Sequence, residues 1–104
     1  MADYQEFKTP SGVVVQVRQR TYTEWEEVEA DRLVKADALI EQRATTPDKA
    51  IVQEMRNMTA HREKNLSLWV KDWPKVKKGL LMSDIAAIEK HCRDTEYGEL
   101  VEKN

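Results

Sequence analysis

The first eighteen residues show the alternation of apolar and polar positions that is typical of short strands. Residues 13–18 read Val-Val-Val-Gln-Val-Arg, so the valines at odd positions fall on one face of an extended chain. A Pro-Ser-Gly triplet at 10–12 suits a turn, because proline presets a turn dihedral and glycine relaxes the end. The pattern predicts a β-hairpin with strands at about 4–8 and 13–20. Its valine face should pack on a helix, because a lone hairpin is marginal in water.

Helical periodicity replaces this alternation after residue 20. Two overlapping capping boxes, Thr21 with Glu24 and Thr23 with Glu26, predict a helix over about 24–43. Most of the apolar side chains of this helix fall on one face. They are Trp25, Val28, Leu33, Ala36, Leu39 and Ile40. Val34 lies on the other side and indicates a second contact.

A second helix start stands at Thr46-Pro47-Asp48, where threonine caps and proline takes the first helical position. Neither proline nor glycine interrupts the chain until Pro74, so a helix over about 47–73 is predicted. It would be roughly 40 Å long at 1.5 Å per residue. One stripe of it is apolar apart from Arg62 in the middle. The apolar members are Ile51, Met55, Met58, Leu66, Trp69 and Trp73.

The remaining chain predicts one shorter helix and a tail. Ser83 is a good N-cap for a helix over about 84–93. One face of this helix carries Ile85, Ile88 and Cys92. Residues 94–104 are polar and are expected to form a tail that frays. The fold class expected is therefore α+β and mainly helical, with one hairpin and three helices in a single domain over residues 1–93.

Size, charge and cysteine usage narrow the class of protein. A chain of 104 residues fits one domain, and a net charge of −2 provides no clearly basic face for nucleic acid. One cysteine permits no internal disulfide, which favours a reducing compartment. The start of the chain lacks the pattern of a signal peptide, and no run approaches the ~20 apolar residues of a membrane span. We expect a cytoplasmic protein with no membrane partner.

Catalytic and metal-binding patterns are weak in this sequence. A nucleophile needs a neighbouring base, and the candidates are Cys92, His61 and His91. His91 and Cys92 are adjacent on a helix, so their side chains point about 100° apart and do not pair easily. One cysteine and two separated histidines also make a poor zinc site, and no phosphate-binding glycine motif occurs. We expect no enzyme activity, no cofactor and no metal.

The apolar stripe of the long helix is the most informative candidate site. A hairpin and two other helices are too small to cover about 40 Å of it, and an uncovered apolar patch marks an interaction surface. Methionine adapts to varied partners, and tryptophan is enriched at binding hot spots. Arg62 fits through a snorkelling stem or a carboxylate partner. The protein-binding residues predicted are Met55, Met58, Arg62, Leu66, Trp69 and Trp73.

The segment Phe7–Arg18, with its F-x-x-P-S-G start and alternating strand, resembles the opening of bacteriophage tail assembly chaperones. The resemblance continues through Thr21–Trp25 and, more loosely, at Leu81–Ile85. It covers about the first quarter of the chain and implies a small helical protein of the infected host's cytoplasm. Such a protein would bind the long, helical tape-measure protein and keep it soluble during tail assembly. The resemblance implies no catalytic residues, and self-association through the same stripe is a further expectation.

Two other functions compete with this interpretation. The first is a structural subunit of a phage tail or of a head-tail adaptor, which would share the small α+β style. The second is a nucleic-acid-binding regulator that uses Lys71–Lys78, with Trp69 and Trp73 stacking on bases. Against the second, the lysine cluster is short and the overall charge is acidic. A solvated linker beside two core tryptophans is therefore favoured for that segment.

Overall fold

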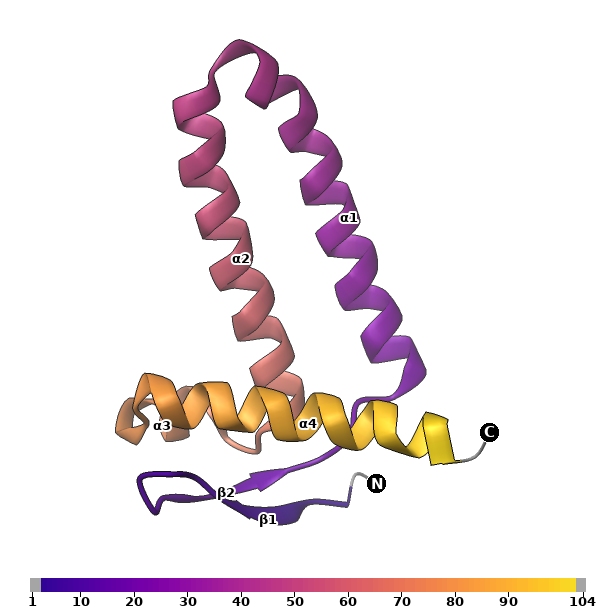
Figure 1. Ribbon diagram of the computed structural model, residues 1–104, viewed down its shortest axis with the longest axis vertical. Coiled ribbons are helices and arrows are strands. Elements are labelled where there is room, and N and C mark those ends of the chain that lie inside the picture. Colours follow the sequence, from indigo (N-terminus) through magenta and orange to yellow (C-terminus); the bar gives the residue numbers. More distant parts are fainter. Residues whose placement is uncertain (1–2, 103–104) are drawn as a thin grey trace. The chain divides into compact units, whose positions relative to one another are not determined.

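The structure is a computed structural model that describes residues 3–102. In chain order the elements are β1 (Gln5–Lys8), β2 (Val14–Val17), α1 (Tyr22–Thr45), α2 (Pro47–Trp69), α3 (Trp73–Val76), the 3-10 helix η1 (Lys77–Gly79) and α4 (Met82–Glu102) (Figure 1). The prediction of a mainly helical α+β fold with an N-terminal hairpin is confirmed. The chain divides into two compact units. Unit 1 holds the residues up to Arg20 and from Leu66 onward, and unit 2 holds Thr21–Asn65.

The hairpin of unit 1 forms where the sequence predicts it, with shorter strands. β1 and β2 pair antiparallel, with Phe7 opposite Val15. Gly12 takes a positive φ of 94°, which a residue without a Cβ adopts at no steric cost, and its N–H donates to the Thr9 carbonyl at 2.9 Å. Val15 and Val17 are buried, so the predicted valine face does pack inward.

The second helix ends four residues before the predicted end at Trp73. After Trp69 the chain turns along the free edge of β2. The N–H of Arg18 donates to the Trp69 carbonyl, and the N–H of Lys71 donates to the Gln16 carbonyl, both at 2.9 Å. Asp72 follows with a left-handed φ of 57°. The stop therefore comes from backbone pairing with β2, and Pro74 lies in the first turn of a new short helix, α3, instead of ending the long one.

The core of unit 1 collects side chains from β2, from the end of α2, from α3 and from α4. Its buried members are Val15, Val17, Leu66, Trp69, Val70, Trp73, Ile88 and Cys92. The Ile88 and Cys92 face of the last helix is thus used as predicted. This helix, α4, continues past the predicted end at Arg93 to Glu102, into the segment expected to form a polar tail. Residues 103 and 104 of that tail lie outside the described residues, and the single domain over residues 1–93 stays a prediction.

The hairpin turn is bonded to the start of α4, which joins two of the segments that carry the family resemblance. Asp84 is fully buried and accepts bonds from both the N–H and the hydroxyl of Ser11, at 3.0 and 2.6 Å. It also accepts the Leu81 N–H at 3.0 Å, which closes the first turn of α4. The helix therefore begins at Met82, before the predicted N-cap Ser83, and Asp84 in the first turn bonds the N–H that precedes it. The bonds from the Ser11 hydroxyl and the Leu81 N–H hold the pKa of Asp84 below its ordinary value.

Asp84→Asn is expected to lower the thermal midpoint of unit 1 by about 5 °C at pH 7, because the amide offers one acceptor oxygen where the carboxylate offers two. A carboxylate whose pKa is lowered by folding stabilises at pH values above its unfolded pKa. That contribution is lost as the pH falls through the folded pKa. The wild type should therefore lose stability below about pH 4, and the variant should lose less. Circular dichroism melts between pH 7 and pH 2 measure both effects; equal midpoints at pH 7 would contradict the role given to Asp84.

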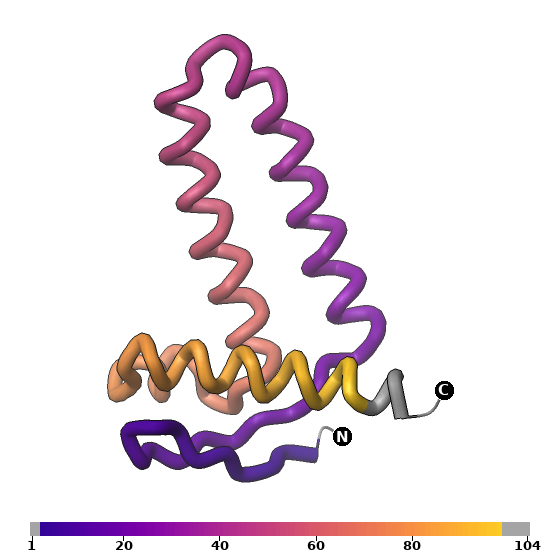
Figure 2. Tube along the Cα trace, in the orientation of Figure 1, coloured from indigo at the N-terminus to yellow at the C-terminus, as the bar shows by residue number. Residues whose placement is uncertain are grey.

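Unit 2 is a helical hairpin with a very short connection. Of the two predicted capping boxes, Thr21 with Glu24 is the one that forms, and α1 follows it. Thr46 alone separates α1 from α2, and its N–H donates to the Gln42 carbonyl at 2.8 Å. The two helices diverge from this turn (Figure 2). Charged side chains connect them, with Arg43 bound to Glu54 and Lys64 bound to Asp31, each pair at 3.0 Å.

Candidate protein-binding surface

Three of the six predicted binding residues lie in the core of unit 1. Leu66, Trp69 and Trp73 are 1%, 0% and 3% exposed. The expectation was that the molecule cannot cover the whole stripe, and these three residues lie in the part that it does cover, so their predicted role as exposed binding residues is wrong. The reason is the early end of α2, since the turn of the chain at residues 70–72 folds Trp73 back beside Trp69 and under the hairpin.

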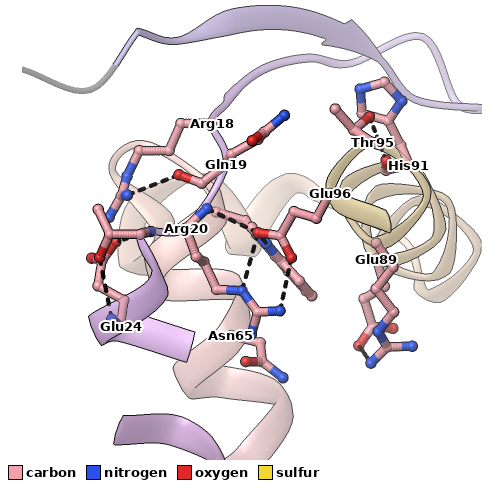
Figure 3. A network of polar contacts seen from close by, with 12 residues as sticks. Arg18, Gln19, Arg20, Glu24, Asn65, Glu89, His91, Thr95 and Glu96 are labelled. Atoms are coloured by element: carbon pink, nitrogen blue, oxygen red, sulfur yellow. Dashed lines mark hydrogen bonds and ion pairs between the residues drawn. The ribbon is translucent and has the colours of Figure 1, made fainter. Parts of the chain in front are cut away.

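The indole of Trp69 is also held by polar groups. Its Nε1–H donates to Glu96 Oε2 at 3.0 Å, and the Arg20 guanidinium lies over the ring at 4.4 Å from the centroid. Arg20 in turn bonds Glu96 through Nη2 at 2.8 Å and through its own backbone N–H at 2.9 Å (Figure 3). Burial raises the pKa of Glu96, but the bonds from Arg20 and Trp69 outweigh it and the pKa lies below its ordinary value. This arrangement ties the end of the hairpin to α4 and has a structural role.

The other three predicted residues are exposed on α2 within unit 2. Met55 and Met58 leave 65% and 67% of their surface in solvent, and Arg62 is also exposed. Ile51, one turn before Met55, is 59% exposed. The first half of the predicted stripe therefore is an uncovered apolar surface.

Helix α1 carries a matching set that sequence reasoning assigned to the core. Of its six predicted core residues, only Val28 and Leu39 are buried, whereas Leu33 and Ile40 are 58% and 64% exposed. Single exposed apolar residues are ordinary on a protein surface. Two exposed apolar stripes on neighbouring helices are unusual. Whether they form one surface depends on the sides of the two helices on which they lie.

Helix geometry places both stripes on the same side of unit 2. On α1, Ile40 follows the buried Leu39 by one residue and Leu33 precedes Leu39 by six. Around the helix axis, Ile40 and Leu33 are therefore both rotated from Leu39 by roughly 100–120° in the same direction. On α2, Ile51 follows the buried Ala50 by one residue, about 100° in that sense, and Met55 and Met58 fall beside it. The helices run antiparallel from the turn at Thr46, and we infer that the buried residues Leu39 and Ala50 mark the sides on which they face each other. An equal rotation therefore brings both stripes to one side.

We call this surface the apolar face, and it consists of Leu33, Ile40, Ile51, Met55 and Met58. A cavity of about 190 Å³ lies between the helices and includes Met58 in its wall. Ala36 and Leu39 add apolar atoms to this wall, and Arg43 and Glu54 add charge. The apolar face thus borders a groove between the helices, and Met58 is the member of the face that lies in its wall.

Sequence reasoning missed the half of the surface that lies on α1. The sequence does contain part of the signal for this surface. Leu33 and Ile40 are seven residues apart, which is the heptad spacing of helices that pair in coiled coils. The face assigned to α1 was also wide, since it spanned six apolar residues. A hairpin of two helices joined by one residue buries only a narrow part of so wide a face. Val34, for which the sequence predicts a second contact, is 69% exposed and lies on a different side from Leu33.

The chemistry around Cys92 does not favour a nucleophile. The thiol is buried, and burial raises its pKa to about 12, so it stays protonated at neutral pH. Its neighbour His91 is stacked on Phe7 with ring centroids 4.4 Å apart. A pocket of about 440 Å³ reaches both residues and is otherwise lined mainly by polar side chains, among them Asp3 and Arg18. Within residues 3–102, no three histidine, cysteine or acidic side chains gather as metal ligands would.

The basic segment over 71–78 has no exposed tryptophan beside it to stack on the bases of a nucleic acid. Its lysines are exposed, but Trp69 and Trp73 are buried in the core and offer no free ring face to a base. The ammonium group of Lys71 lies 5.6 Å from the centroid of the Tyr4 ring. These observations agree with a solvated linker beside core tryptophans.

Among the helices that the structure describes, none combines the length and the hydropathy that crossing a lipid bilayer requires. Comparisons of the chain with protein-family models, with curated proteins and with solved structures found no match.

Proposed function

We propose that the protein is a non-enzymatic binding protein whose apolar face holds an apolar helix of another protein. The observation that carries the proposal is the position of five large, exposed apolar side chains on one side of the helical hairpin. Contiguous apolar surface of this kind, with charged residues around it, is typical of interaction sites. An amphipathic partner helix would present its own apolar positions at spacings of three and four residues along the groove.

The partner we propose is the tape-measure protein of a bacteriophage tail, and the place of action is the cytoplasm of the infected host. The resemblance of Phe7–Arg18 to tail assembly chaperones supports this choice. So does the Ser11–Asp84 contact, because it joins this segment to Leu81–Ile85, the other end of the resemblance. A long helical protein with apolar stripes aggregates when those stripes are uncovered. A small chaperone with an adaptable, methionine-containing face would shield them.

The test is coexpression of the full chain with the tape-measure protein of the same phage. The expected result is a soluble tape measure that co-elutes with the chain. Met58→Glu should reduce the co-eluting fraction at least tenfold, because it places a charge in the middle of the apolar contact. Val34→Glu is the matched control, since Val34 is 69% exposed, close to the 67% of Met58, and lies off the apolar face. It should leave co-elution unchanged.

Three outcomes would count against the proposal. A tape measure that stays insoluble beside excess chain would remove the chaperone function. Equal losses with both variants would remove the apolar face as the binding site. Detection of the chain in purified phage particles by mass spectrometry would favour a tail or adaptor subunit, because an assembly chaperone is absent from the finished particle.

A further inference from the structure

The apolar face is large enough to form an interface between two copies of the chain. Each of its five side chains leaves between 58% and 67% of its surface in solvent. Together they expose on the order of 600 Å² per copy, against about 800 Å² per partner in an interface of standard size. The groove between the helices adds to this area. We propose that two copies pair through the apolar face and form a four-helix bundle.

The symmetry of this pairing follows from how far the apolar residues lie from the turn at Thr46, measured along the helices. Ala36 lies ten residues before Thr46 and Met55 lies nine residues after it, so both are about 14–15 Å from the turn. A single two-fold axis at this level crosses both helices. It sets α1 against α1 of the second copy and α2 against α2, each pair antiparallel.

The two-fold axis brings apolar residues of one copy opposite apolar residues of the other. Leu33 and Ile40 lie on either side of Ala36 on α1, so Leu33 of one copy meets Ile40 of the other. On α2, Ile51 and Met58 lie on either side of Met55, which falls close to the axis. A closed two-fold interface requires such self-complementary positions.

The charges at the edges of the apolar face are also complementary under the same axis. Asp48 and Arg62 lie seven residues to either side of Met55, so each meets the opposite charge of the second copy. Glu29 and Arg43 are related in the same way about Ala36, and each also has an ion-pair partner within its own chain, Arg32 for Glu29 and Glu54 for Arg43. Opposite charges at the edge of an interface set its register and contribute less to its affinity.

The dimer does not rest on the proposed tail partner, because it needs no other protein. It is the form expected when no partner helix covers the apolar face. The two bindings then compete for one surface, and the self-pairing is measured with the purified chain alone.

Light scattering and sedimentation equilibrium of the full chain, at concentrations up to about 100 µM, should show a dimer. Leu33→Glu and Met58→Glu should each raise the dissociation constant of the dimer at least 100-fold, because each buries a charge in the contact. Val34→Glu should leave the constant within about threefold, since this side chain lies off the apolar face. All three positions are exposed, so circular dichroism should show an unchanged helix content. A monomer over the whole range, or an equal effect of Val34→Glu, would overturn the proposal.

The alignment has its own test. Met55→Cys places a thiol close to the two-fold axis and should form a disulfide between copies on mild oxidation, because the two Cβ atoms face each other. Val34→Cys is the matched control, with similar exposure on another side, and should stay reduced. Cys92 is buried and should add no background. Equal rates of crosslinking at the two positions, or a stable dimer in which Met55→Cys never crosslinks, would overturn the alignment.

Discussion

Trp69→Ala is expected to destabilise unit 1 by about 3–5 kcal/mol, the range for removing a large buried aromatic side chain. Trp69 is 0% exposed and belongs to the buried core cluster that includes Val15 and Val17 of β2. Its loss also removes the Nε1 bond to Glu96 and the stacking of Arg20. Urea unfolding followed by circular dichroism measures the change, with hydrogen exchange of the β2 amides reporting on unit 1 by itself.

Trp25→Ala is the control for this prediction. Trp25 is 36% exposed on α1 in unit 2, so its removal should cost less than about 1.5 kcal/mol and should leave exchange of the β2 amides unchanged. If the two variants had equal effects on unit 1, the core role assigned to Trp69 would be wrong. If Trp69→Ala were as stable as the wild type, the packing described for the hairpin and α2 would be wrong as a whole.

Glu96→Ala is expected to destabilise unit 1 by about 2–4 kcal/mol, because it removes one partner of a largely buried ion pair. The side chains of Arg20 and Glu96 are 5% and 16% exposed, so the Arg20 Nη2 and the Trp69 Nε1–H would each lose a hydrogen bond in a largely buried place. Glu96→Gln keeps one oxygen acceptor and should fall between the wild type and Glu96→Ala. Denaturant unfolding of the three proteins at pH 7 gives the order.

The pH dependence of the same comparison has a definite sign. Folding lowers the pKa of Glu96, so its contribution is present above the unfolded pKa, about 4.3, and is lost as the pH falls through the folded value. The difference in stability between the wild type and Glu96→Gln should therefore shrink in acid. Asp94→Ala serves as the control. This variant breaks the ion pair between Asp94 and Lys90. The two side chains are 64% and 78% exposed, so its loss should leave the denaturation midpoint unchanged. A difference that grows below pH 4 would contradict the role given to the Glu96 carboxylate.

The local signals in the sequence predicted the elements well. The Pro-Ser-Gly triplet placed the hairpin turn, the Thr21 and Glu24 box placed the start of α1, and Pro47 placed the start of α2. Each of these signals acts through hydrogen bonds or dihedrals within a few residues, so it can be recognised without knowing the rest of the fold. The end of α2 was different. No residue near Trp69 stops a helix by itself, and the stop depends on backbone bonds to β2, some fifty residues earlier.

That one long-range contact also decided which apolar residues form the core and which form the candidate surface. The periodicity of residues 51–73 assigned six apolar positions to one stripe, and every position in such a stripe looks equivalent in sequence. Pairing of residues 70–71 with β2 draws Leu66, Trp69 and Trp73 under the hairpin, and leaves Ile51, Met55 and Met58 on a helix with a single neighbour.

The sequence by itself determined the mainly helical α+β class, the starts of the hairpin and of the first two helices, and the residue types available for binding. These properties depend on dihedral preferences, capping groups and hydrophobic period, which are local. Only the tertiary structure decided where α2 ends, that Asp84 and Glu96 are bonded to residues more than seventy positions away, and that α1 and α2 present apolar side chains on one side. Burial depends on which distant segments share a neighbourhood, and a periodic pattern does not contain that information.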